Sequence, residues 1–272
     1  MMASPVLSLP GLAVGPEGAR EVSRALPEEW PVAFSFDGST QAVMMATPQD
    51  LEDFALGFAL SEGIVEGVED IAEFELVLHE AGSECRFWLK PGRGASLEAR
   101  RRAFAGPVGC GLCGIDSLEE ANRALPKVPV GKVLSAAEVS GAAEALRGAQ
   151  PLHDRTRAVH AAGFVQPGRG LVLAREDVGR HNALDKLIGA MARGGIDPAR
   201  GAFVLTSRIS MELIQKAAVA QCPVIIGVSA PTAHAVRLAK GAGITLAAFA
   251  RGRSFDLYAH PDRIRTGASD VA

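Results

Sequence analysis

The chain has 272 residues, of which 48% are hydrophobic and 22% charged, and its formal net charge at pH 7 is -3. This composition is typical of a soluble globular protein with one large or two modest domains, and it excludes a global attraction to nucleic acid. Four cysteines are too few for a disulfide framework. The chain has neither a long uninterrupted apolar run nor a basic N-terminal leader, so we expect a cytoplasmic protein without a membrane span.

The first 125 residues predict a lead-in followed by a small α+β lobe. Residues 1–29 are rich in Pro, Gly and Glu, which predicts a loose N-terminal segment. Residues 31–47 alternate apolar and polar side chains around a turn at 37–39 and therefore predict a β-hairpin. The other elements expected in this lobe, which spans 30–125, are a helix capped by Thr47, a strand pair at 74–80 and 84–90, and a short basic helix at 96–105.

Residues 126–272 predict a second lobe of the α/β class. After a proline-rich boundary at 126–135, helices and continuous apolar strands alternate along the chain. The expected helices are 135–149, 179–195, 210–220 and 232–243, and the expected strands are 158–165, 170–175, 202–207, 223–230 and 244–250. Apolar strands that alternate with helices are typical of a mostly parallel sheet covered by helices. We therefore predict a two-lobed protein whose larger lobe holds this sheet, with its strands mixed or mostly parallel.

A Cys-x-x-Cys motif lies in the glycine-rich stretch 108–121. Cys110 and Cys113 precede a capping box formed by Ser117 and Glu120, so a helix is predicted to begin just after the loop. A helix N-terminus and the arginines at 100–102 both favour the thiolate form, which attacks sulfur and binds metal. The pair is therefore a candidate for thiol chemistry.

Three other interpretations of the cysteine pair remain open. A zinc site needs further ligands, and the His-x-Glu sequence that precedes Pro-Cys-x-x-Cys in zinc deaminases is missing from this chain. A thioredoxin-like site would follow an early strand in a compact domain, a context that this sequence lacks. The two cysteines could also be incidental members of a glycine-rich loop. Cys85 and Cys222 lie in apolar stretches and are expected to pack as small hydrophobic side chains.

A second group of polar residues lies at the start of the helix predicted at 179–195. Asp177 could cap this helix, and His181 and Asp185 lie four residues apart on a face away from the apolar side chains. The simpler interpretation is a His–Asp pair on a solvated helix face. Because His181 follows Arg180 at a helix start, it could instead contact an anion.

Hydroxyls and arginines follow three of the predicted strands of the second lobe. They are Ser207 and Arg208, Ser229 and Thr232, and Arg251 and Arg253. Open α/β sheets bind ligands at the carboxyl ends of their strands, where hydroxyls and free amides at helix starts suit phosphate and a guanidinium pair suits pyrophosphate. Plain helix capping would explain the hydroxyls as well. The sequence has no Walker or dinucleotide-binding glycine motif, so an ATPase or a nicotinamide enzyme is not expected.

An ordered set of motifs resembles the formate dehydrogenase accessory sulfurtransferase (FdhD) family. The set comprises VMMATPQDLEDFALGFALSEGI, GCGLCG, EDVGRHNALDKLIG, SRISMELIQKAA, VSAPT and ITLAAFARG, and the resemblance runs from about Pro31 to Asp262. It implies a fold similar to that of the cytidine deaminases, without their zinc, and a homodimer. It also implies a sulfurtransferase that accepts persulfide sulfur from a cysteine desulfurase. The sulfur would pass to the molybdenum bis(molybdopterin guanine dinucleotide) cofactor that formate dehydrogenase needs.

The same resemblance assigns roles to individual residues. Cys110 matches the persulfide-bearing cysteine, and Cys113 matches its partner. The stretch assigned to cofactor binding corresponds to Phe249, Ala250, Arg251, Gly252, Arg253 and Ser254, and the strand-end analysis adds Ser207, Arg208, Ser229, Thr232 and His181. The expected partners are a cysteine desulfurase, the catalytic subunit of formate dehydrogenase and the guanine nucleotide portion of the cofactor, which is bound as substrate; zinc, nucleic acid and membrane are not expected. The alternatives are a non-enzymatic chaperone for the molybdenum cofactor and a zinc-dependent deaminase.

Overall fold

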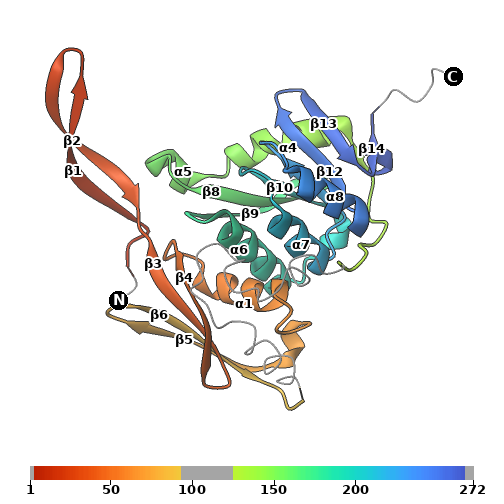
Figure 1. The fold of residues 1–272 in the computed structure, drawn as a ribbon, viewed down its shortest axis with the longest axis horizontal. Helices are drawn as coiled ribbons and strands as arrows, with labels where there is room; N and C mark the ends of the chain where they lie inside the picture. Colours follow the sequence, from red (N-terminus) through yellow and green to blue (C-terminus); the bar gives the residue numbers. More distant parts are fainter. Residues whose placement is uncertain (1–2, 93–124, 267–272) are drawn as a thin grey trace.

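The computed structural model describes residues 3–92 and 125–266, which form two lobes and a protruding hairpin (Figure 1). The N-terminal part contains β1 (Val6–Gly15), β2 (Gly18–Pro27), β3 (Trp30–Phe36), β4 (Ser39–Ala46), α1 (Leu51–Ser61), β5 (Ile71–His79) and β6 (Gly82–Leu89). The C-terminal part contains β7 (Leu134–Ser135), α4 (Ala136–Arg147), α5 (Pro151–Thr156), β8 (His160–Gln166), β9 (Gly170–Asp177), α6 (Arg180–Arg193), β10 (Ala202–Leu205), α7 (Met211–Val219), β11 (Val224–Gly227), α8 (Ala233–Ala242), β12 (Thr245–Arg251), β13 (Ser254–Ala259) and β14 (Ile264–Arg265). Single 3₁₀ turns cover Val68–Asp70, Pro198–Arg200 and Pro261–Arg263.

The N-terminal lobe is a four-stranded sheet backed by one helix. The strand order is β4-β3-β6-β5, with β3 and β6 parallel and the outer pairs antiparallel. Both predicted strand pairs are confirmed. The core lies between the sheet and α1, where the rings of Phe34 and Phe58 stack with their centroids 4.5 Å apart. The predicted basic helix at 96–105 lies outside the described residues.

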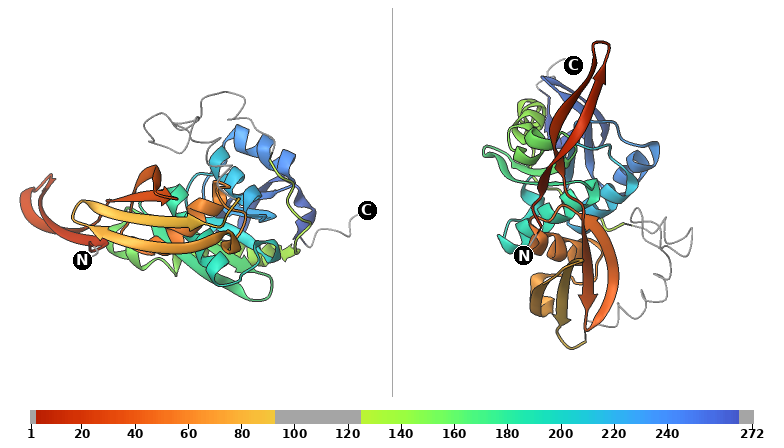
Figure 2. Two further views of the ribbon diagram at one scale, coloured as in Figure 1. Left: turned by 90° about the horizontal axis from the view of Figure 1, so that it is seen from below. Right: turned by 90° about the vertical axis from the view of Figure 1, so that its left-hand side faces the viewer.

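Two expectations for the N-terminal part are wrong. Residues 6–27 form the antiparallel β1–β2 hairpin, which extends away from the body (Figure 2), rather than a loose lead-in. Val6, at the start of β1, packs against Leu152 and Val159 of the other lobe and anchors the base of the hairpin there. Thr47 does not cap α1: the helix follows Asp50, whose backbone is left-handed, and the Thr47 hydroxyl accepts a hydrogen bond from the Val178 amide at 3.1 Å.

The C-terminal lobe confirms the α/β class with a six-stranded mixed sheet. The strand order is β13-β12-β11-β10-β8-β9. Only the neighbours β10, β11 and β12 run parallel, whereas the other pairs are antiparallel. Of the two predicted arrangements the sheet therefore has the mixed one, because β8–β9 and β12–β13 are hairpins and a short turn can join only antiparallel strands. The predicted helices and strands of this lobe are confirmed in their order.

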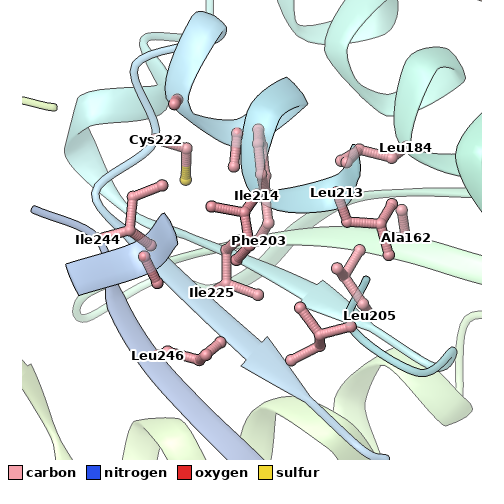
Figure 3. Packing of buried hydrophobic residues seen from close by; sticks show 14 of the residues in the cluster. Ala162, Leu184, Phe203, Leu205, Leu213, Ile214, Cys222, Ile225, Ile244 and Leu246 are labelled. Carbon is pink, nitrogen blue, oxygen red and sulfur yellow. The ribbon is translucent and has the colours of Figure 1, made fainter. Parts of the chain in front are cut away.

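Helices cover both faces of the larger sheet. One core lies between the sheet and α6, α7 and α8, and Figure 3 shows Phe203, Ile225 and Leu246 from β10, β11 and β12 packing below Ile214 of α7. A second core lies under α4 on the opposite face. As expected, Cys85 and Cys222 are buried, and burial raises the pKa of each thiol to about 12. Neither thiol is therefore a nucleophile at neutral pH.

The two lobes meet where α1 crosses α6 (Figure 1). The crossing depends on two glycines, because a Cβ atom at Gly57 would lie 1.7 Å from the Asp185 carbonyl oxygen, and one at Gly189 would lie 1.9 Å from the Asp53 carbonyl oxygen. Such close approach leaves no room for side chains between the helices. The helices are therefore in direct backbone contact.

Buried charges join the lobes on either side of this crossing. Lys186 on α6 and Asp177 at the end of β9 are both fully buried, and their charged atoms lie 2.6 Å apart. The Lys186 ammonium also donates to the Thr47 carbonyl at 2.9 Å, and Asp177 accepts from the Thr47 amide at 3.0 Å. Thr47 is thereby fixed against the end of β9 and against α6. No helix within the described ranges is long and apolar enough to cross a membrane.

Candidate anion-binding site

Three strand ends meet at one edge of the larger sheet. Because β10, β11 and β12 are parallel, their carboxyl ends and the starts of α7 and α8 lie on the same side (Figure 1). The turn after β10 is bonded to the turn after β11, since the Ile209 amide donates to the Ala230 carbonyl at 3.0 Å and the Thr232 amide donates to the Ile209 carbonyl at 2.9 Å. The Phe249 amide of β12 donates to the Ser229 carbonyl at 3.3 Å. The structure therefore brings together the two predicted hydroxyl-bearing turns and the beginning of the predicted 249–254 stretch.

The hydroxyls at this edge have different roles. Thr232 is a true N-cap of α8, because its side chain accepts from the Ala235 amide at 3.1 Å. The buried Ser207 hydroxyl donates to the Arg208 carbonyl at 3.2 Å. Ser210 has the backbone conformation of an N-cap for α7, yet its side chain accepts no capping hydrogen bond. The first turn of α7 therefore presents amide groups that its own cap residue does not satisfy.

Positive charge is available at the surface of the same edge. Arg208, Arg251 and Arg253 are exposed, and the last two flank Gly252 in the left-handed turn of the β12–β13 hairpin, where its φ is 57°. Ala250 is buried, and Ser254 is exposed with its hydroxyl donating to the Arg251 carbonyl at 3.2 Å. Exposed guanidinium groups at the same sheet edge as helix starts can bind a polyanion.

Phe249 is a strained residue at the end of β12. Its φ is 53°, it lies at an irregularity in the β12–β13 pairing, and 41% of its surface is exposed. A bulky residue in the left-handed region costs free energy and is found most often at functional sites. The strain directs an apolar ring to the surface beside the Ser229 turn.

The start of α6 brings His181 to Glu212, not to Asp185. The His181 Nε2 and Glu212 Oε2 atoms lie 3.8 Å apart, and 13% and 15% of the two side chains are exposed. Burial, together with Arg180 and Lys216, lowers the pKa of His181 to about 4, so the imidazole is neutral at pH 7. The predicted His–Asp pair on a solvated face is therefore wrong.

Asp185 belongs to a separate buried cluster between the lobes. Its carboxylate lies 2.9 Å from the Lys216 ammonium and accepts from the Ser61 hydroxyl at 2.6 Å. Burial raises the pKa of Asp185 to about 6. Burial alone would lower the pKa of Lys216, but the negative charges of Asp185 and Glu62 have the larger combined effect and raise this pKa.

Asp177 is not the cap of α6 either. The N-cap is Gly179, whose amide donates to the Asp177 carboxylate at 2.7 Å. The side-chain amide of Asn182 donates to the same carboxylate at 2.9 Å. Asp177 therefore holds the turn that presents Arg180 and His181, with Lys186 as its counter-ion.

The candidate thiols, Cys110 and Cys113, lie outside the described residues. Within residues 3–92 and 125–266 no group of three or more His, Cys, Asp or Glu side chains is placed to hold a metal ion. No sequence pattern indicates a role for Lys186, Lys216, Ser210 or Glu212. Lys186, Lys216 and Glu212 stand in ordinary amphipathic helix patterns and Ser210 stands at an ordinary cap position. Only the packing of α1, α6 and α7 shows that these side chains are largely buried.

These features define a two-lobed α/β protein in which helix starts and arginines meet at one sheet edge. The model of the FdhD/NarQ family matches residues 27–265, and the chain belongs to this family. It is 50% identical over 242 residues to a sulfur carrier protein FdhD of Agrobacterium fabrum, covering 89% of each chain. It is also 50% identical over 248 residues to a sulfur carrier protein FdhD of Brucella abortus, covering 91% of this chain and 92% of the relative.

A solved structure shares the fold. A crystal structure from Desulfotalea psychrophila, of a protein proposed to be a formate dehydrogenase accessory protein, superposes with a TM-score of 0.75 at 26% identity. The match covers 96% of this chain and 99% of that one.

Proposed function

We propose that the protein is a sulfur carrier that accepts persulfide sulfur from a cysteine desulfurase and passes it to the molybdenum bis(molybdopterin guanine dinucleotide) cofactor of formate dehydrogenase. The Cys-x-x-Cys motif carries this proposal, and the names of the FdhD relatives support it. The arginine-bearing sheet edge supports a polyanionic acceptor, because it supplies local positive charge in a chain whose net charge is -3.

The proposed sulfur transfer is an exchange between a cysteine thiolate and a persulfide. The Cys110 thiolate attacks the outer sulfur of the donor persulfide, the sulfur–sulfur bond of the donor breaks, and the donor cysteine leaves as a thiolate. Cys110 then carries the persulfide. Release of this sulfur as sulfide requires two electrons, and attack of the Cys113 thiolate on Cys110 supplies them by forming a disulfide. Cys113 is therefore proposed as the resolving partner.

A cofactor chaperone without sulfur transfer is the second candidate, and the same sheet edge favours it. In both functions the protein binds the cofactor through its guanine nucleotide end. Its phosphates would lie at the starts of α7 and α8, close to Arg208 and Arg251. Only the sulfur carrier requires a persulfide on the loop, so mass analysis of the loop separates the two.

We expect Arg208→Ala and Arg251→Ala each to weaken GDP binding roughly tenfold to hundredfold, the loss typical of one charged hydrogen bond to phosphate. Calorimetric titration of GDP measures this effect. Arg200→Ala is the matched control, because Arg200 is also exposed but lies just before β10, at the opposite end of the parallel strands. Unchanged dissociation constants for GDP in both variants would show that this sheet edge does not bind the cofactor.

A further inference from the structure

The β1–β2 hairpin, here called the arm, exposes apolar side chains along most of its length. They are Leu7, Leu9, Leu12, Val14 and Leu26, and 41% to 77% of each of these residues is exposed. Among the described strands the arm pairs with no other, and beyond its base it extends away from both lobes (Figures 1 and 2). An isolated two-stranded hairpin is at best marginally stable in water, so an arm of this kind is expected to pack against a second molecule.

One face of the arm combines leucines with arginines. Every second cross-strand pair projects from the same face of a two-stranded ribbon. On this face, which we call the leucine–arginine face, the pairs are Leu7–Leu26, Leu9–Arg24, Gly11–Val22 and Ala13–Arg20. Both arginines are exposed. The leucine–arginine face is therefore apolar toward the base of the arm and positively charged toward its tip, which suits an apolar surface with negative charge beside it.

A groove with these properties lies between α1, β5 and the end of α6, away from the candidate anion-binding edge. Its volume is about 440 Å³, and its lining is mainly apolar, with Leu56, Phe74 and Phe87 among the side chains. The charged residues that line it are Glu52, Glu73 and Arg193, and Arg193 is already paired with Glu52 at 2.9 Å. One negative charge is therefore left over, at an exposed residue, Glu73, on β5.

We propose that the leucine–arginine face of one copy of the chain docks into this groove on a second copy, and that the second copy docks its own arm in return. The leucines contact the apolar lining, and Arg24 pairs with Glu73. Within one chain, Val6 anchors the base of the arm against the larger lobe and the arm extends away from the body, so the groove is left open (Figure 2). Exchange about a two-fold axis covers both arms and both grooves and closes the assembly at two copies.

The area of the arm favours a second copy over an unrelated partner. Each strand of the arm has 10 residues. Such a ribbon is about 33 Å long and about 10 Å wide, so one face covers about 330 Å². Docking of one arm buries roughly 650 Å² when arm and groove are counted together, which is well below the range of about 1,200–2,000 Å² for stable interfaces. Exchange of two arms doubles this area to about 1,300 Å², which lies within that range.

Sedimentation equilibrium of the full-length protein tests the leucine–arginine face. We expect a dimer, and we expect Leu9→Asp to raise its dissociation constant roughly tenfold to hundredfold, because the change places a carboxylate in the apolar contact. Val14→Asp is the matched control, since Val14 lies on the opposite face of the same arm and is 77% exposed. It should leave the dissociation constant unchanged.

A charge exchange between arm and groove tests the partner surface. Arg24→Glu and Glu73→Arg should each weaken the dimer, whereas the double variant should recover most of the loss, because it restores opposite charges across the contact. A monomeric wild type would overturn the proposal, and so would equal effects of Leu9→Asp and Val14→Asp. A double variant as weak as the two single changes combined would overturn the groove as the binding surface of the arm. None of these outcomes bears on sulfur transfer, which the persulfide on Cys110 tests separately.

Discussion

Substitution of Lys186 by methionine should lower the free energy of unfolding by about 3–5 kcal/mol, the cost of leaving one partner of a buried ion pair uncompensated. The Lys186 ammonium has no exposed surface and lies 2.6 Å from the Asp177 carboxylate. Methionine retains much of the apolar length of the lysine side chain, so the substitution leaves little cavity. The lost free energy of unfolding therefore measures the contribution of the charge and of its hydrogen bond to Thr47.

The consequence extends beyond stability because Asp177 also fixes the turn before α6. Its carboxylate accepts from the Gly179 amide and from Asn182, and so positions Arg180 and His181. Denaturant titration of Lys186→Met measures the destabilisation, with Lys90→Met as the control because Lys90 is exposed just after β6. If both variants unfolded at the wild-type denaturant concentration, the buried pair would contribute nothing to the junction between the lobes.

Substitution of Cys110 by alanine should abolish maturation of the client formate dehydrogenase. No other thiol can replace it, because Cys113 is its proposed resolving partner and Cys85 and Cys222 are buried, with pKa values of about 12. The measurement is client activity in a deletion strain that expresses each variant at equal level.

Cys222→Ala is the appropriate control for this experiment, since it removes a thiol that lies inside the core under α7 (Figure 3). It should cost some stability and preserve client maturation. Full client activity with Cys110→Ala would show that the motif cysteine does not carry the sulfur.

The order of the elements in the larger lobe could be predicted from sequence because their periodicity is strong. The apolar runs of β10 and β11 are too short for helices, and α6, α7 and α8 each have a clear apolar face. Strand direction could not be predicted in the same way. It depends on which segments pair, and the β8–β9 and β12–β13 hairpins made the sheet mixed.

The N-terminal hairpin was missed for a different reason. Pro and Gly interrupt the alternation in β1 and β2, and most residues of both strands remain exposed, so burial against a core does not drive their pairing.

The candidate site was only partly predictable. The turns at Ser207–Ser210 and Ser229–Thr232 follow directly from strand ends and caps, and the structure confirms that they adjoin. The partner of His181 was not predictable, because Glu212 is 31 positions away in the sequence and reaches it only through the packing of α6 on α7. For the same reason, the spacing between His181 and Asp185 indicated a pair that the burial of Asp185 prevents.

Persulfide mapping of the two motif cysteines tests the sulfur-carrier function most directly. The full-length protein is incubated with a cysteine desulfurase and cysteine, and peptides containing Cys110 and Cys113 are analysed by mass spectrometry without reductant. We expect a gain of about 32 Da, the mass of one sulfur atom, on the peptide that carries Cys110. An unmodified Cys110 after a complete desulfurase reaction would contradict sulfur transfer and favour the cofactor chaperone.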